Sequence, residues 1–181
     1  PNDDLEFDSS FTDYFLEGNR KVLSGLRMAL VIPQQSLRES VKRVFAKTPR
    51  LDPKSVMTPF QLAESDADFD LAFVDEAHRL GQRANQASGV QNGKFRDINV
   101  TLFGDDHAKY TQLDWIRARS RHQILLIDEE QSVRPHDLAT TTLRAEVRSA
   151  KARGHHFPLM TQMRVKAGAD YIGFVRAALR G

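Results

Sequence analysis

The chain has 181 residues, of which 40% are hydrophobic and 28% charged, and its formal net charge is +2; this composition is typical of a globular domain. It contains no cysteine, so disulfides and thiolate metal sites are excluded. No apolar run approaches the roughly 20 residues of a membrane helix, and the acidic start is unlike a signal peptide. We therefore expect a cytoplasmic protein that binds no membrane.

Short β-rich runs alternate with helical stretches along the chain, which predicts an α/β fold with a mostly parallel sheet. The expected strands are 28–32, 55–58, 69–74 and 124–127, with a weaker one at 156–160. The expected helices are about 11–26, 36–47, 138–152 and 168–180, the second with a buried face formed by Leu37, Val41, Val44 and Phe45. Because the strand runs are continuously apolar, we expect both faces of the sheet to be covered.

Three features between residues 81 and 122 each allow two interpretations. The polar, turn-rich segment 81–104 predicts a mobile surface insertion, either a passive loop or a lid or nucleic-acid contact. Trp115 is either a core residue or a platform for a base. The basic stretch is either a solvated helix face or a contact with a phosphate backbone; it comprises Arg117, Arg119, Arg121 and His122.

Carboxylates follow two of the predicted strands. Asp75 and Glu76 come directly after 69–74, and Asp128 follows 124–127. In open α/β sheets the ligand site lies outside the carboxyl ends of the strands. Phosphoryl transfer needs one acid to hold Mg²⁺ and another group to orient or deprotonate water, which suits Asp75 and Glu76 respectively. The amide of Gln131 can bond both a phosphate oxygen and the attacking water.

Several ordered strings resemble one family. DEAH at 75–78, DEEQSVRP at 128–135, and QMR at 162–164 followed by GADYIGFV resemble the Schlafen-like DNA/RNA helicase domain family, which is related to superfamily 1 helicases. The segment ALVIPQQSLRESVKRVF at 29–45 is similar to motif Ia of that family, and TQLDWI at 111–116 also resembles its pattern. The resemblance spans nearly the whole chain.

The resemblance implies a three-layer RecA-like P-loop NTPase core, incomplete at its N-terminal side, that uses Mg²⁺ and ATP and binds DNA or RNA. It makes Asp75 the Mg²⁺ ligand, Glu76 the catalytic base and Gln131 the γ-phosphate sensor. Arg164 resembles the motif IV arginine, which would stabilise charge on the transferring phosphoryl group. The turn that faces nucleic acid would contain Pro33, Gln34, Gln35 and Ser36.

The chain also departs from the family pattern. No G-x-x-x-x-G-K-[ST] phosphate loop precedes residue 29, and Ile127 stands where superfamily 1 usually has glycine. We therefore expect residues 1–181 to be part of a longer RecA-like domain, with little ATPase activity alone and a possible homodimer through the incomplete sheet. The other hypothesis is a non-catalytic nucleic-acid or partner-binding module that keeps the fold.

Overall fold

The computed structural model describes residues 25–83, 89–128, 131 and 135–159. The chain divides into two compact units, Pro1–Ala145 and Glu146–Gly181. The described part of the second unit contains the end of one helix and the segment up to residue 159. The predicted helices at 11–26 and 168–180, and the candidate residue Arg164, lie outside the described residues.

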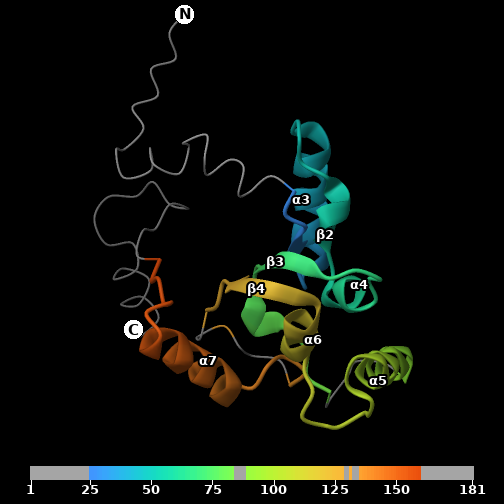
Figure 1. Cartoon of the computed structure of the whole chain (residues 1–181), viewed down its shortest axis with the longest axis vertical. Helices are drawn as coiled ribbons and strands as arrows, with labels where there is room; N and C mark the ends of the chain where they lie inside the picture. The colour runs from blue at the N-terminus through green and yellow to red at the C-terminus, as the bar shows by residue number, and fades with distance from the viewer. Residues whose placement is uncertain (1–24, 84–88, 129–130, 132–134, 160–181) are drawn as a thin grey trace, which may run out of the picture. The chain divides into compact units, whose positions relative to one another are not determined.

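The described part of the first unit is built on a parallel sheet of four strands in the order β2-β1-β3-β4 (Figure 1). The strands are β1 (Met28–Val31), β2 (Val56–Met57), β3 (Phe69–Val74) and β4 (Ser120–Leu125). Helices connect and flank them. The predicted α/β class and parallel sheet are confirmed, and they are consistent with a RecA-like core.

Two of the connecting helices begin with a capping box, in which a threonine and the third helical residue satisfy each other's backbone N–H groups. Thr58 does so for α4 (Pro59–Ala63) and Thr111 for α6 (Gln112–Arg119). The other helices are α3 (Gln35–Lys47), α5 (Gly89–Phe103) and α7 (Thr140–Ala152), together with the 3-10 helices η2 (Pro53–Ser55) and η3 (Ala77–Arg79). The helices expected at 36–47 and 138–152 are thus confirmed within one or two residues.

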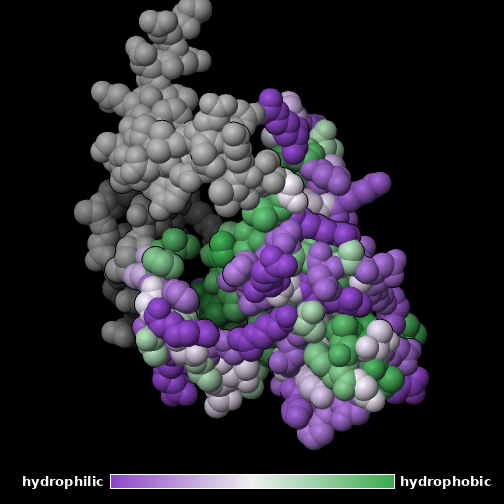
Figure 2. Space-filling view, in the orientation of Figure 1, coloured by the Kyte–Doolittle hydropathy of each residue, from purple (hydrophilic) through white to green (hydrophobic). Residues whose placement is uncertain are grey.

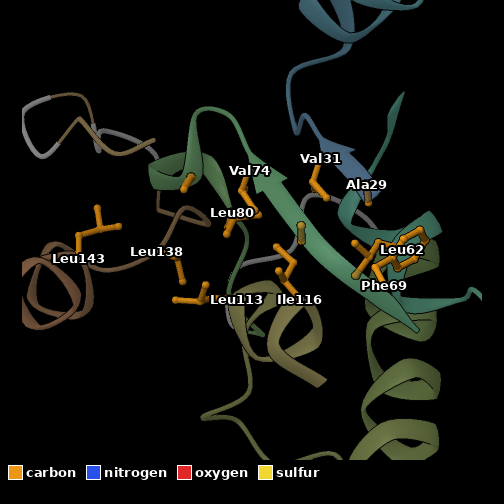
Figure 3. Close-up of a cluster of buried hydrophobic side chains, with 12 residues drawn as sticks. Ala29, Val31, Leu62, Phe69, Val74, Leu80, Leu113, Ile116, Leu138 and Leu143 are labelled. Carbon is orange, nitrogen blue, oxygen red and sulfur yellow. The ribbon is translucent and has the colours of Figure 1, made fainter. Parts of the chain in front are cut away.

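One face of the sheet forms the hydrophobic core. Successive side chains of a strand point to opposite faces, and on this face α4 and α6 supply the side chains that meet the strands (Figure 3). Seven residues of this core are at most 3% exposed: Ala29, Val31, Ala72, Val74, Leu62, Leu113 and Ile116. The core therefore fixes the strands whose ends carry the candidate site.

The opposite face of the sheet is only partly covered in the described part of the chain. Leu30, Phe73 and Ile124 lie in one row across three strands. Ile124 is 45% exposed. Met28, two residues before Leu30 on the same strand, is 50% exposed. Figure 2 also shows hydrophobic residues at the surface. The prediction that both faces are covered is wrong for Met28 and Ile124. An apolar run indicates that a strand can be buried, but it does not show that another element covers it.

The predicted buried face of α3 is likewise incomplete. Leu37, Val41 and Phe45 are half-buried, Val44 is 59% exposed, and the helix contains no buried residue. Helical spacing of apolar residues correctly predicted the helix, but not its burial.

Two strand predictions differ from the structure. β4 begins at Ser120 and ends at Leu125, whereas the expected strand was 124–127. Its polar first half pairs with β3, Phe69 with Ser120 and Leu71 with His122, so the strand is fixed by its neighbour rather than by apolar composition. Residues 156–159 form no strand. The basic stretch therefore runs from α6 into β4 and is not one helix face.

The turn-rich segment after the first acidic motif is mostly a helix, α5, and not a loop. Phe95, Ile98 and Asn99 of α5 are buried. The Phe95 ring lies 4.2 Å from the ring of Trp115, whose Nε1–H donates to Asn99 Oδ1 at 2.7 Å. Trp115 is fully buried, which confirms that it is a core residue. Glycines at 89 and 93 concealed the helix because they weaken its local propensity.

An ion pair fixes the segment before α5 to the turn after it. Arg83 donates to both carboxylate oxygens of Asp106, with distances of 2.8–3.1 Å, and Asn99 Nδ2 donates to Asp106 Oδ1 at 2.8 Å. These hydrogen bonds, that from Arg83 above all, hold the pKa of Asp106 below its usual value despite the opposing effect of burial. Asp106 raises the pKa of Arg83 in turn.

We expect Asp106→Asn to lower the melting temperature at neutral pH and to have progressively less effect in acid. A carboxyl whose pKa is lowered by folding stabilises the fold above its unfolded pKa, about 3.9, and this stabilisation is lost as the pH falls through the folded pKa. Thermal unfolding of both proteins between pH 7 and pH 2.5 would measure the difference. A difference as large at pH 2.5 as at pH 7 would contradict this account.

Candidate functional site

The carboxyl ends of β1 and β3 and the segment after β4 meet at one edge of the sheet. Val31 pairs with Val74, and Val74 with Leu125. The pairing continues beyond the strands: the Asp75 N–H donates to Val31 O at 3.0 Å and the Leu126 N–H to Val74 O at 2.9 Å. Residues that follow these strands are therefore held side by side.

Asp75 is the first residue after β3 and is half-buried. Its Oδ1 accepts from the Glu76 N–H at 3.0 Å, and Oδ2 makes no hydrogen bond or ion pair with a described residue. No cluster of three or more His, Cys, Asp or Glu that could hold a metal is present among the described residues. A single carboxylate fits Mg²⁺, which proteins commonly hold through one or two carboxylates, with phosphate and water completing the shell.

Glu76 turns the chain sharply from β3 into η3. Its backbone is left-handed, with φ 52° and ψ 44°, a conformation that costs a residue other than glycine about 1–3 kcal/mol and is concentrated at functional sites. Its side chain is 24% exposed, and Oε2 lies 3.3 Å from Arg79 Nε and 3.1 Å from His78 Nε2. Within the described residues, Oε1 has no such contact.

His78 and Asp128 connect this loop to the one that follows β4. The Ala77 N–H donates to Leu126 O at 2.8 Å, and the Asp128 N–H donates to His78 Nδ1 at 3.2 Å. The exposed Gln131 donates from Nε2 to Asp128 Oδ2 at 2.7 Å. The segments that contain Asp75, Glu76 and Gln131 are therefore linked by hydrogen bonds.

The turn after β1 lies at the same edge of the sheet as Asp75. Gln34, Gln35 and Ser36 are exposed there, and Gln34 makes no side-chain cap for α3. Arg38 holds the turn from behind, since its Nη1 donates to Ile32 O at 3.0 Å and to Pro33 O at 3.2 Å. Arg38 could not be recognised from the sequence, because an arginine inside a helix carries no local sign of such a contact.

The basic candidates lie at the opposite edge of the sheet. Arg121 is the second residue of β4, and the start of β4 pairs with the start of β3. It is exposed and lies 3.7 Å from Asp70. Arg119 donates to Ala63 O at 3.1 Å and its side chain is only 21% exposed, so it holds α4 and α6 together. The structure thus separates Arg117, Arg119 and Arg121 from the acidic loops.

Comparison with known protein families identifies the family of this chain. The model of the family described as Schlafen group 3, DNA/RNA helicase domain, matches residues 5–181. The chain belongs to this family. Searches of curated proteins and of solved structures gave no match. Membership of the Schlafen group 3 helicase domain family assigns this chain a role related to nucleic-acid helicases.

The described helices include none long and apolar enough to cross a bilayer.

Proposed function

We propose that this Schlafen group 3 domain is part of an ATP-hydrolysing, nucleic-acid-dependent helicase or translocase, in which Mg-ATP hydrolysis is coupled to binding of DNA or RNA. The observation that carries the proposal is the hydrogen-bonded junction between residues 75–78 and 128–131. Phosphoryl transfer depends mainly on positioning and electrostatics, so the groups that hold the metal, the water and the terminal phosphate need a shared, fixed frame.

In this proposal each residue has a separate task. Asp75 offers its free oxygen to Mg²⁺, which when bound would neutralise charge on the phosphates. Glu76 accepts the proton of the attacking water through Oε1, while Oε2 is held by Arg79. Gln131 contacts the terminal phosphate with its amide. Arg164 would stabilise the charge that develops there, although it lies outside the described residues.

The nucleic acid is proposed to contact the turn that contains Gln34, Gln35 and Ser36. These side chains are exposed and share the sheet edge with Asp75, so strand contacts there would lie near the site of hydrolysis. Amide and hydroxyl groups suit phosphate and sugar contacts that fix position without reading sequence. The basic residues of α6 and β4 lie at the other edge of the sheet. A nucleic-acid strand bound at the turn would contact them only if its path along the domain were longer.

A non-catalytic nucleic-acid or partner-binding module that keeps the fold is the alternative. The two functions differ in whether the natural polypeptide that contains this sequence hydrolyses ATP.

The test is the ATPase rate of that polypeptide with and without single- and double-stranded DNA and RNA. We expect at least one nucleic acid to stimulate hydrolysis, and we expect the paired change Gln34→Ala and Gln35→Ala to weaken the stimulation. The paired change Arg117→Ala and Arg121→Ala, at the other edge, is the matched control and should alter it less. Nucleic-acid binding without hydrolysis under any condition would support the non-catalytic module instead.

A further inference from the structure

We propose that His78 is a positioning residue that ties the carboxylate of Glu76 to the loop carrying Gln131, so that contact with a terminal phosphate also orients the catalytic base. The inference rests on the proposed function, since it concerns how that same site is set for hydrolysis. It starts from an imidazole that is 1% exposed and faces polar groups from two loops.

The hydrogen bond at Nδ1 fixes the tautomer of the ring. The backbone N–H of Asp128 donates to His78 Nδ1 at 3.2 Å, and an acceptor nitrogen carries no proton. In the neutral imidazole the proton must then sit on Nε2. His78 therefore presents an acceptor to one loop and a donor to the other.

Among the described residues, Glu76 is the acceptor nearest to this donor. Nε2 lies 3.1 Å from Glu76 Oε2, yet it makes no aligned hydrogen bond and is a buried polar atom without a partner among the described residues. A buried polar atom without a partner is rare in a native fold, and a catalytic role is one explanation for it. A small movement of the Glu76 carboxylate would align this bond. Arg79 Nε lies 3.3 Å from the same oxygen, so both N–H groups would hold Oε2 and leave Oε1 for the attacking water.

The acceptor side leads to the proposed sensor. Asp128, whose backbone bonds to His78, also accepts from Gln131 Nε2 at 2.7 Å. When Gln131 turns to a phosphate, its bond to Asp128 changes, and Asp128 is attached directly to the buried ring. The contacts Glu76–His78–Asp128–Gln131 thus form one continuous path, the kind of connected polar network that can carry coupling between two groups.

Two substitutions of His78 separate its two contacts. His78→Asn keeps an acceptor oxygen near the position of Nδ1 but cannot reach Glu76. His78→Gln places an amide N–H near the position of Nε2 but removes the acceptor for Asp128. Steady-state ATP hydrolysis by the natural polypeptide, with nucleotide affinity measured by direct binding, distinguishes loss of base orientation from loss of sensor placement.

We expect His78→Asn to lower kcat about tenfold with ATP affinity changed less than about threefold, the size expected from one hydrogen bond to a charged group. We expect His78→Gln to keep kcat within about threefold and to weaken ATP affinity about fivefold or more. His107 gives the matched control, since it is exposed and its Nδ1 also accepts a backbone N–H, from Lys109 at 3.1 Å. His107→Asn and His107→Gln should change neither quantity. Equal effects of both His78 variants on kcat and affinity would overturn the proposal.

Nitrogen-15 NMR of the imidazole gives a readout that does not depend on hydrolysis. We expect His78 in the wild-type protein to be the Nε2–H tautomer, and the Asp128 amide signal to shift strongly in His78→Gln but little in His78→Asn. An Nδ1–H tautomer would overturn the proposal even in an active ATPase. Absence of ATP hydrolysis in the wild type, with the expected spectra, would instead refute the proposed function and leave the two-sided contact intact.

Discussion

Replacing Glu76 with glutamine in the natural polypeptide is expected to lower ATP turnover about 10²–10⁴-fold, the usual contribution of a general base, while Mg-ATP binding is largely retained. Glutamine has nearly the same shape but cannot take a proton from water at neutral pH. The backbone of residue 76 is left-handed, and the substitution does not change side-chain branching, so the loop should keep its conformation. Asp75, the proposed metal ligand, is unaltered.

Turnover and binding must be measured separately for this test. ATP hydrolysis gives the rate, and titration with a fluorescent or non-hydrolysable ATP analogue gives the dissociation constant. Asp68→Asn is a suitable control, because it also removes one carboxylate but lies just before the start of β3, with its side chain 73% exposed. Retained turnover in Glu76→Gln would exclude Glu76 as the base. Loss of binding together with a lower melting temperature would indicate that residue 76 has a structural role.

The sequence predicted the parts of the site that depend on local pattern. β3 has the predicted bounds, 69–74, because a mostly apolar run is followed by an abrupt change to the charged pair Asp75 and Glu76. β1 was predicted within one residue, and the proline after Ile32 marks where its ladder ends. Since parallel strands place their carboxyl ends at one edge, these assignments were enough to bring 75–78 near Asp128.

What the sequence could not show are features set by distant partners. Ser120–Gln123 are polar, and they form a strand because β3 offers an unsatisfied edge. Phe95 and Ile98 form the buried side of α5 because Trp115 lies against them. The link through His78 is of the same kind: its imidazole accepts from the backbone of a residue 50 positions away, and local sequence does not name that partner.

Truncating Trp115 to alanine is expected to destabilise the domain by about 3–5 kcal/mol, the range for deletion of a large buried aromatic ring. The ring is fully buried, with the ring centroids of Phe95 and Phe60 at 4.2 Å and 5.2 Å. Its loss removes these contacts and leaves Asn99 Oδ1 without its donor. Chemical denaturation would measure the change, and Val100→Ala, at a half-exposed position of α5, should stay within about 0.5 kcal/mol.

Trp115→Phe separates packing from hydrogen bonding, because it keeps an aromatic ring and removes Nε1–H. We expect Trp115→Phe to cost about 1–3 kcal/mol, the penalty of leaving the Asn99 oxygen without its donor, and therefore less than Trp115→Ala, which also loses the ring packing. A cost equal to that of alanine would mean that the ring contributes nothing beyond its N–H.

The hydrogen bonds of Trp115 and Asp106 both involve the side-chain amide of Asn99. Asn99 accepts from Trp115 through Oδ1 and donates to Asp106 through Nδ2, so either neighbour fixes the orientation of the amide for the other. Trp115→Phe and Asp106→Asn should therefore be non-additive: once one partner is lost, Asn99 can turn, and the second substitution costs less than it does alone. Strict additivity in the double-mutant cycle would show that Asn99 is held by the backbone of α5 alone. In that case α5 would be fixed to α6 by the packing of Phe95 and Ile98, and the polar network would only tie down the ends of the segment.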